Sequence, residues 1–292
     1  MANISAALVK QLREMTDSPM MECKKALVEA EGDLDSAIDI LRRNGLAAAA
    51  KKAGRDTNEG AIGAYVSDDL KIGSLVEVAC ETDFVASNPR FTGFTTRLAE
   101  IVASEQPEDI DALLGCPYEG ETVQDALTEL IHVIGENMKI SRLVLRRADA
   151  GALSSYVHMG GKIAVLVEFA FEHPSTSAAE PYLVFAHDVA MQVAAAAPTA
   201  AVREDVPADV IDHEISIYKA QAAQSGKPEA IQEKMATGRL EKYFKSFVLN
   251  EQEFIKDPGI TIDAYAANVS EQVGDKISIV GFDRLERGGS EA

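Results

Sequence analysis

Residues 60–79 have the sequence GAIGAYVSDDLKIGSLVEVA, and residues 151–170 have the sequence GALSSYVHMGGKIAVLVEFA. The two stretches align without a gap at a shift of 91 residues, and ten of the twenty positions are identical. Each contains two apolar runs separated by a short turn, which is typical of a β-hairpin with antiparallel strands. The repetition indicates an internal duplication of two α+β halves, each beginning with a hairpin.

The two copies diverge directly after the second strand. Residues 80–85 are CETDFV in the first copy, whereas residues 171–176 are FEHPST in the second. The hairpin turns also differ, with SDD at residues 67–69 against HMG at residues 158–160. A purely structural loop had less reason to diverge this far, so we look for function in these segments first.

The first 45 residues predict three short helices. Ser5 is expected to cap the first, and Ser18 followed by Pro19 to begin the second. Asp33 is expected to cap the third helix and Gly45 to end it. The helical spacing predicts a small core made by Leu8, Leu12, Met15, Cys23, Leu27, Leu34, Ala37, Ile38 and Leu41.

The helices that follow are predicted mainly from residues typical of a helix N-terminus. Asn88 followed by Pro89 predicts one helix, and Thr122 with Asp125 three residues later predicts another through a capping box. The first of these two helices is expected to bury Phe91, Phe94, Leu98 and Ile101. Further strands are expected at residues 140–146 and 276–284, and a further helix at residues 261–272.

Residues 180–250 are strongly helical in pattern. Pro181 begins a long helix that runs to Ala197, and Pro207 begins a second one. In residues 225–228, SGKP, the glycine is expected to end one helix and the proline to begin the next. Long helices with a short join form an antiparallel hairpin, which we expect to project as an arm and to serve a partner or self-association.

The fold class expected from these patterns is α+β. We expect four units: residues 1–55 as a three-helix domain plus linker, residues 56–149 as the first half of the core, residues 150–181 and 228–287 as its second half, and residues 182–227 as the arm.

Composition excludes several classes of protein. The 292 residues carry a net charge of −19, which disfavours nucleic acid as a direct partner because a phosphate backbone attracts a basic face. The cysteines Cys23, Cys80 and Cys116 are odd in number and scattered, which is typical of a reducing cytoplasm rather than of a disulfide framework. No secretory signal and no membrane-spanning stretch are expected.

The segment from Thr82 to Val85 is the main candidate site. Asp83 beside Phe84, just after a strand, places a charge and an apolar side chain on one short loop. If Phe84 is exposed, it is a candidate for insertion into a pocket of a partner protein. The alternative is that Phe84 folds into its own core and Asp83 only caps a turn.

Other chemistry-bearing residues give weaker signals. His158 has no cluster of carboxylates or histidines that would hold a metal, and residues 159–162, MGGK, lack the spacing of a phosphate loop. A Cys80–His158 hydrolase lacks a local nucleophile signature. We therefore expect no cofactor, no metal and no covalent chemistry, and we expect the function to depend on contacts with another macromolecule.

Met20 and Met21 compete for one buried side of a small core. We expect one of them to be exposed, either as a filler of the core surface or as a soft contact for a partner helix.

The chain resembles the bacterial elongation factor Ts family, the nucleotide exchange factors of the translational GTPase EF-Tu. The most specific motif is VEVACETDFVA at residues 76–86. The resemblance extends over the chain through LR at 12–13, MMECKKAL at 20–27, IGEN at 134–137, His158 with GGK at 160–162, AMQ at 190–192, SGKP at 225–228 and EKM at 233–235. Two departures are DSP at residues 17–19, where the family usually has glycine, and Ala79, where it often has asparagine.

This resemblance implies a protein that binds EF-Tu·GDP and promotes GDP release, without being an enzyme. It implies an N-terminal domain similar to a ubiquitin-associated fold and a duplicated core that contacts EF-Tu. Residues 82–85 are implied to dislodge Mg²⁺ from the nucleotide site of the partner. Secondary contacts are expected from Leu12, Arg13, Met20, Met21, Lys24 and His158.

Three alternatives stay open on the sequence. The first is a passive binder of the GTPase that leaves nucleotide release unchanged. The second is an enzyme that uses Cys80 and His158. The third is a scaffold that dimerises through the arm, which is compatible with exchange activity.

Overall fold

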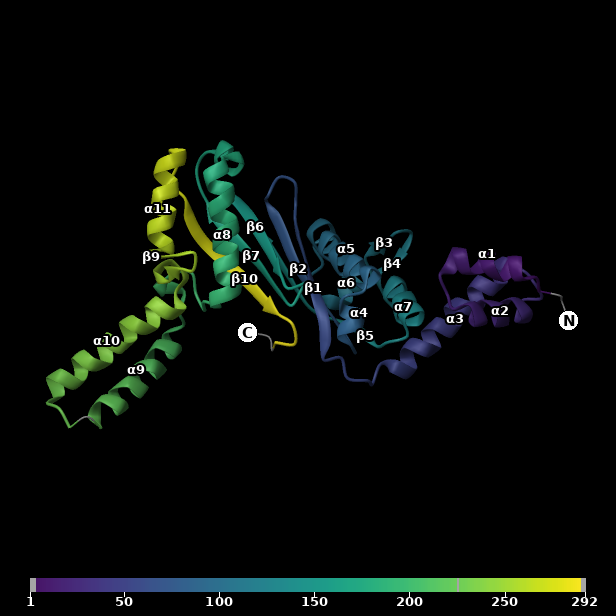
Figure 1. Cartoon of the computed structure of the whole chain (residues 1–292), viewed down its shortest axis with the longest axis horizontal. Coiled ribbons are helices and arrows are strands. Elements are labelled where there is room, and N and C mark those ends of the chain that lie inside the picture. Colours follow the sequence, from purple (N-terminus) through teal and green to yellow (C-terminus); the bar gives the residue numbers. More distant parts are fainter. Residues whose placement is uncertain (1–3, 225, 290–292) are drawn as a thin grey trace.

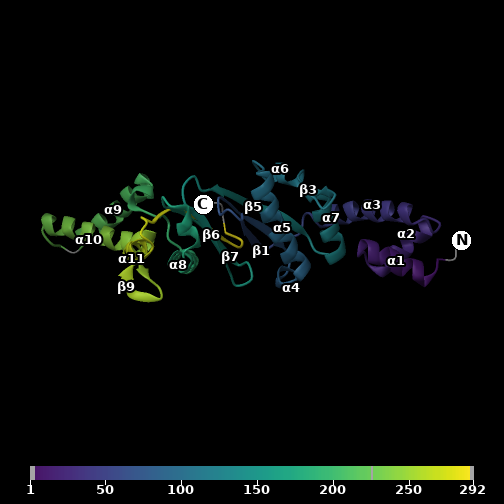
Figure 2. The same cartoon turned by 90° about the horizontal axis from the view of Figure 1, so that it is seen from above.

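The structure is a computed structural model that describes residues 4–224 and 226–289. The molecule is elongated, with three helices at the N-terminal end, a core of sheets and helices in the middle and a helical hairpin at the opposite end (Figure 1). Viewed from above, these three parts follow one another along the long axis (Figure 2). The α+β class expected from the sequence is confirmed. Among the described residues, no helix combines the length and apolarity needed to cross a membrane.

The elements of the N-terminal half are α1 (Ala6–Thr16), α2 (Met20–Glu29), α3 (Leu34–Lys52), β1 (Glu59–Val66), β2 (Ile72–Cys80), α4 (Asp83–Ala86), α5 (Pro89–Glu105), α6 (Ile110–Leu114), β3 (Pro117–Tyr118), β4 (Glu121–Thr122), α7 (Val123–Ile134) and β5 (Met138–Arg147). Those of the C-terminal half are β6 (Ala152–His158), β7 (Ile163–Ala170), η1 (Pro174–Ala178), α8 (Glu180–Ala196), η2 (Arg203–Asp205), α9 (Ala208–Ala223), α10 (Glu229–Phe247), η3 (Leu249–Glu251), β8 (Glu253–Phe254), β9 (Asp257–Thr261), α11 (Ile262–Val273) and β10 (Ser278–Glu286).

The duplication is visible in the sheets. One sheet has the strand order β1-β2-β5 and the other β6-β7-β10, with all pairs antiparallel. Ile62 pairs with Glu77 in the first hairpin, and Leu153 pairs with Glu168 at the equivalent place in the second. Both sheets also have a register shift where the third strand joins, at Glu77 and at Glu168. The two halves therefore share register and irregularity as well as sequence.

The two halves contact each other in a pseudo-symmetric way. The N–H of Ile62 donates to the carbonyl of Gly161 (2.9 Å), and the N–H of Leu153 donates to the carbonyl of Leu70 (2.8 Å). The shift of 91 residues relates the donor Ile62 to the donor Leu153 and the acceptor Leu70 to the acceptor Gly161, so the two bonds are equivalent. Between the sheets lies one apolar cluster of buried residues: Ile62, Leu75, Ala148, Leu153, Ala164, Leu166 and Leu285. Each hairpin turn thus docks on the first strand of the other half.

The N-terminal helices follow most of the expected signals. Ser5 caps α1 and Asp33 caps α3, each by accepting a backbone N–H. Ser18 does not cap α2, because α2 begins one residue later than expected and Pro19, which has no side-chain acceptor, occupies the N-cap position. Met15, which was predicted to lie in the helical core, is 55% exposed. Val9, which was not predicted there, is buried in that core.

Gly45 does not end the third helix. α3 continues to Lys52 and passes Gly45 against α7, where a Cβ on Gly45 would lie 3.6 Å from Cβ of His132. The prediction was wrong because an αL glycine ends a helix only when the chain must turn there. Here the helix crosses from the N-terminal unit onto the core.

Ion pairs join the N-terminal helices to the core. Arg90 lies 3.0 Å from Asp17, and Arg42 lies 3.2 Å from Glu121. The ring of His132 is buried, and its Nε2 lies 3.0 Å from a carboxylate oxygen of Glu22. These contacts place the corner between α1 and α2 beside the start of α5.

The projecting hairpin consists of α9 and α10 (Figure 1). Residues 182–227 do not form it as expected, because α8 belongs to the core. α8 is apolar around its circumference and buries Tyr182, Phe185, Val189 and Val193 against the second sheet. Pro207 and Pro228 precede the two helices of the hairpin as expected, and Ser225 of the predicted turn lies outside the described residues.

Candidate partner-binding site

The loop after β2 presents an aromatic side chain to solvent. Residues 83–86 form the short helix α4, and the hydroxyl of Thr82 caps it by accepting the N–H of Val85 (3.4 Å). Val85 is buried in the core of the first half, whereas the neighbouring Phe84 is 85% exposed. Asp83 is exposed as well. The alternative in which Phe84 folds into its own core is therefore wrong.

The base of this loop is tied to the segment between α7 and β5. The backbone N–H of Thr82 donates to Glu136 Oε2 (3.0 Å), and its hydroxyl donates to Glu136 Oε1 (2.7 Å). In return, the N–H of Asn137 donates to Glu81 Oε1 (2.5 Å). The loop thus has a firm base and a solvent-exposed tip.

The second half contains the same attachment without the aromatic tip. Asp275 follows α11 as Glu136 follows α7, and it accepts the N–H of His173 (2.8 Å) and the hydroxyl of Thr176 (2.7 Å). The hydrogen bond from Thr176 is the main reason why the pKa of Asp275 is lowered to about 2. At the shift of 91 residues, Ser175 stands where the first half has Phe84.

Cys80 lacks the properties of a nucleophile. Its side chain is fully buried, and its thiol donates to the carbonyl of Thr82 (Sγ–O distance 3.2 Å). Burial, followed by the nearby charge of Glu136, raises the pKa of the thiol to about 12. A thiol of this kind is protonated at neutral pH, which argues against the Cys80–His158 hydrolase.

His158 lies at the turn of the second hairpin. Its Nδ1 is 3.0 Å from the hydroxyl of Tyr156, and the next residue, Met159, is 64% exposed. Gly161 in the same turn contacts Ile62 of β1, which pairs with Glu77 of β2. Cys80 lies three residues further along β2, or about 10 Å. The turn therefore lies toward the same end of the first sheet as the loop.

The other predicted contacts lie on the N-terminal helices. Arg13 and Lys24 are exposed, and both Met20 (48%) and Met21 (63%) are exposed rather than one of them. Leu12 is fully buried in the helical core, so we assign it a packing role. The ion pair between Asp17 and Arg90 fixes this corner beside the helix that follows the loop.

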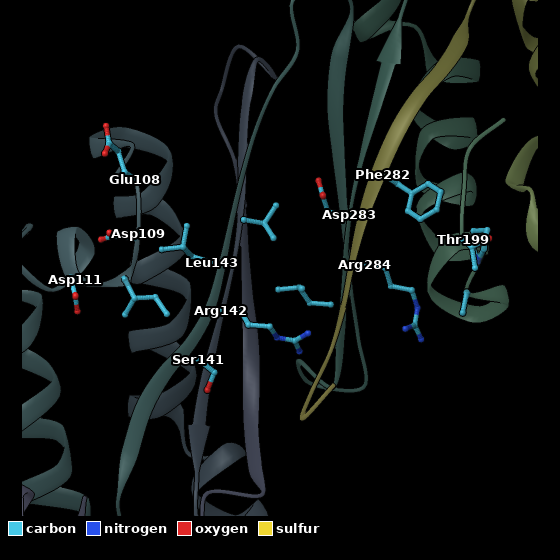
Figure 3. A pocket seen from close by; sticks show the side chains of 15 residues that line it. Glu108, Asp109, Asp111, Ser141, Arg142, Leu143, Thr199, Phe282, Asp283 and Arg284 are labelled. Atoms are coloured by element: carbon cyan, nitrogen blue, oxygen red, sulfur yellow. The ribbon is translucent and has the colours of Figure 1, made fainter. Parts of the chain in front are cut away.

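A cleft of about 1020 Å³ opens between the edges of the two sheets (Figure 3). One wall carries Glu108, Asp109 and Asp111, and the opposite side carries Arg284. Arg142 in the floor is paired with Glu77 (2.6 Å), and Arg284 donates to the carbonyl of Ala194 (3.3 Å). The sequence did not reveal this cleft because its lining comes from four separate segments, and its arginines serve internal ion pairs and carbonyls.

In the part of the chain that the structure describes, no group of three or more His, Cys, Asp or Glu side chains is placed to hold a metal ion.

Comparisons with known proteins place the chain in a family. The family model described as elongation factor TS matches residues 81–289. The chain is 47% identical over 286 residues to an elongation factor Ts of Clostridium perfringens strain SM101, covering 98% of this chain and 93% of the relative. It is 45% identical over 286 residues to an elongation factor Ts of Clostridium botulinum strain Alaska E43, with the same coverage.

Proposed function

Because this chain belongs to the elongation factor Ts family, we propose that it binds EF-Tu·GDP and promotes the release of GDP so that GTP can bind. Family membership makes it a translation elongation factor that acts in nucleotide exchange. The observation that carries the mechanism is the exposure of Phe84 on a firmly tied loop. A large apolar side chain held in water gains free energy when it enters an apolar pocket.

The proposed mechanism acts on the contacts that hold GDP. In a GTPase with a phosphate loop, backbone amides, a lysine and Mg²⁺ hold the nucleotide. Phe84 inserts beside the switch region of EF-Tu and displaces backbone that supports the metal and the phosphate. Asp83 accepts hydrogen bonds from the displaced backbone. Phosphate and metal contacts then weaken together, and no covalent bond is made or broken.

Several contacts are needed because exchange is a coupling between two ligands. The factor weakens nucleotide binding by the same ratio as nucleotide weakens binding of the factor. A thousandfold ratio requires about 4 kcal/mol. We propose Arg13, Met20, Met21, Lys24 and His158 as the secondary contacts. Leu12 contributes indirectly, through the packing of the helices that carry the methionines.

The wider setting is also a proposal. The net charge of −19 supports a protein partner with a basic face and no direct nucleic-acid contact. The three cysteines are free thiols, which supports a cytoplasmic location. A homodimer through the arm formed by α9 and α10 is compatible with exchange activity.

The test is stopped-flow release of a fluorescent GDP from EF-Tu. The parent chain is expected to accelerate release strongly, and Phe84→Ala is expected to reduce the accelerated rate roughly thirtyfold, the ratio that corresponds to a contact worth about 2 kcal/mol. Ile255→Ala is the matched control, since Ile255 is also exposed (44%) but lies in the turn between β8 and β9.

Each outcome has a clear meaning. If the parent and Phe84→Ala both accelerate GDP release, the exchange function is supported, but the mechanism depends on contacts other than Phe84. Binding of a folded parent to EF-Tu with no acceleration rejects the exchange function and leaves a passive binder.

A further inference from the structure

We propose that Glu136 is a positioning residue for nucleotide exchange: its carboxylate holds the base of the loop so that Phe84 points into solvent in an insertion-ready geometry. This inference rests on the proposed role of Phe84. Glu136 lies outside the segment that carries Phe84, at the end of α7 and 54 residues from Thr82. Its carboxylate accepts hydrogen bonds from Thr82 of the loop, so its effect on exchange is transmitted through the loop.

The carboxylate engages both polar groups of Thr82. One oxygen accepts the backbone N–H (3.0 Å) and the other accepts the hydroxyl proton (2.7 Å). Because the hydroxyl donates its proton to Glu136, its lone pairs face the N–H of Val85, which donates to it (3.4 Å). One carboxyl group therefore orients the cap of α4, and α4 carries Phe84.

The rest of the loop leaves little freedom at this base. The carbonyl of Thr82 accepts the N–H of Ala86 (3.1 Å) and the thiol of Cys80 (3.2 Å). The side chain of Val85 is buried next to the exposed Phe84. The direction of the Phe84 ring thus depends on the orientation of Thr82, which Glu136 determines.

The position of Glu136 is not a favourable one for a carboxylate. It follows the helical cap Gly135 (φ +89°) at the C-terminal end of α7, where the helix dipole is negative. The hydrogen bonds from Thr82 offset this unfavourable placement. A carboxylate here is therefore explained by its attachment to the loop.

The second half provides an internal comparison. Asp275 follows Gly274 (φ +70°) at the end of α11 and attaches the corresponding loop by the same type of bonds. That loop carries Ser175 in place of Phe84. Asp275→Ala removes the same kind of attachment without touching an aromatic tip, which makes it the matched control for Glu136→Ala.

The first measurement uses the free chain and is independent of EF-Tu. The chain has no tryptophan, so Phe84→Trp introduces a single fluorescent reporter at the tip of the loop. Time-resolved anisotropy of this indole is expected to show a larger amplitude of fast motion when Glu136→Ala is added, and no change when Asp275→Ala is added. Unchanged indole motion with Glu136→Ala overturns the positioning role, whatever Phe84 does in exchange.

The second measurement is stimulated GDP release with native Phe84. Glu136→Ala is expected to reduce the accelerated rate at least tenfold. Thr82→Val, which removes the hydroxyl that donates to Glu136, is expected to resemble Glu136→Ala. Asp275→Ala is expected to keep the parent rate. Equal losses of rate for Glu136→Ala and Asp275→Ala overturn the proposal, because they indicate a general loss of structure.

Circular dichroism of each variant checks the fold. If Glu136→Ala does not fold, Glu136→Gln replaces it, because the amide keeps the shape and one acceptor while losing the charge. A loosened indole in Glu136→Ala together with an unchanged exchange rate in Phe84→Ala supports the positioning of the loop and rejects the proposed role of Phe84 in exchange, so the two failures are distinguishable.

Discussion

At the scale of the residue, the thiols illustrate how burial changes reactivity. Cys80 and Cys23 are fully buried, whereas Cys116 is partly exposed. Burial is the largest cause of a raised pKa at all three, and it raises the pKa of Cys80 to about 12. A raised pKa lowers the fraction of thiolate at any pH below it, and the thiolate is the reactive form.

Alkylation with iodoacetamide at pH 8 is therefore expected to label Cys116 slowly and to leave Cys80 and Cys23 unlabelled in the native chain. Mass spectrometry of tryptic peptides measures the site and extent of labelling. Denaturation in urea is expected to make all three cysteines reactive and serves as the control. Labelling of Cys80 in the native chain at its denatured rate contradicts this expectation.

At the scale of the element, α3 shows a helix that continues through a glycine. Gly45 is buried, and the position of a Cβ there would be in ordinary van der Waals contact with His132 at 3.6 Å. Alanine is favoured over glycine inside a helix by about 1 kcal/mol. A methyl group fits this site, whereas a larger side chain would press on the buried ring of His132.

Gly45→Ala is expected to raise the free energy of unfolding by about 1 kcal/mol. Gly45→Leu is expected to lower it by about 1–3 kcal/mol through overpacking against α7. Urea unfolding followed by circular dichroism measures both changes. Destabilisation by Gly45→Ala would show that the contact between α3 and α7 has no room for a methyl group.

At the scale of the whole molecule, the two halves are stabilised by one shared core between their sheets. Leu75 and Leu166 are equivalent under the shift of 91 residues, and both are fully buried in that cluster. The reciprocal bonds of Ile62 and Leu153 lie in the same contact. A cavity created at either leucine is therefore expected to lower the stability of both halves.

Leu75→Ala and Leu166→Ala are each expected to lower the free energy of unfolding by roughly 2–5 kcal/mol. In the double variant, the two effects are expected to be non-additive by about 0.5–3 kcal/mol because the residues share one cluster. Urea unfolding of the two single variants and the double variant measures this coupling. Val280→Ala, at an exposed position (46%) on β10, is the control that is expected to change little.

Features that depend on near neighbours could be predicted from the sequence alone. The caps at Ser5, Asp33, Asn88 and Thr122 and the duplicated hairpins all involve groups a few residues apart or a repeated pattern. For the same reason, the loop at residues 82–85 was recognised from its own sequence. Its role in exchange stays a prediction.

Features that depend on contacts between distant segments could be seen only in the folded chain. The sequence pattern left open whether Phe84 is buried, because its neighbours fit either outcome; the attachment of Thr82 to Glu136 holds it outward. The sequence pattern predicted that α8 belongs to the arm, whereas in the structure α8 packs against the second sheet as part of the core. In each case the deciding partner lies more than 50 residues away or in another element, where local periodicity carries no information.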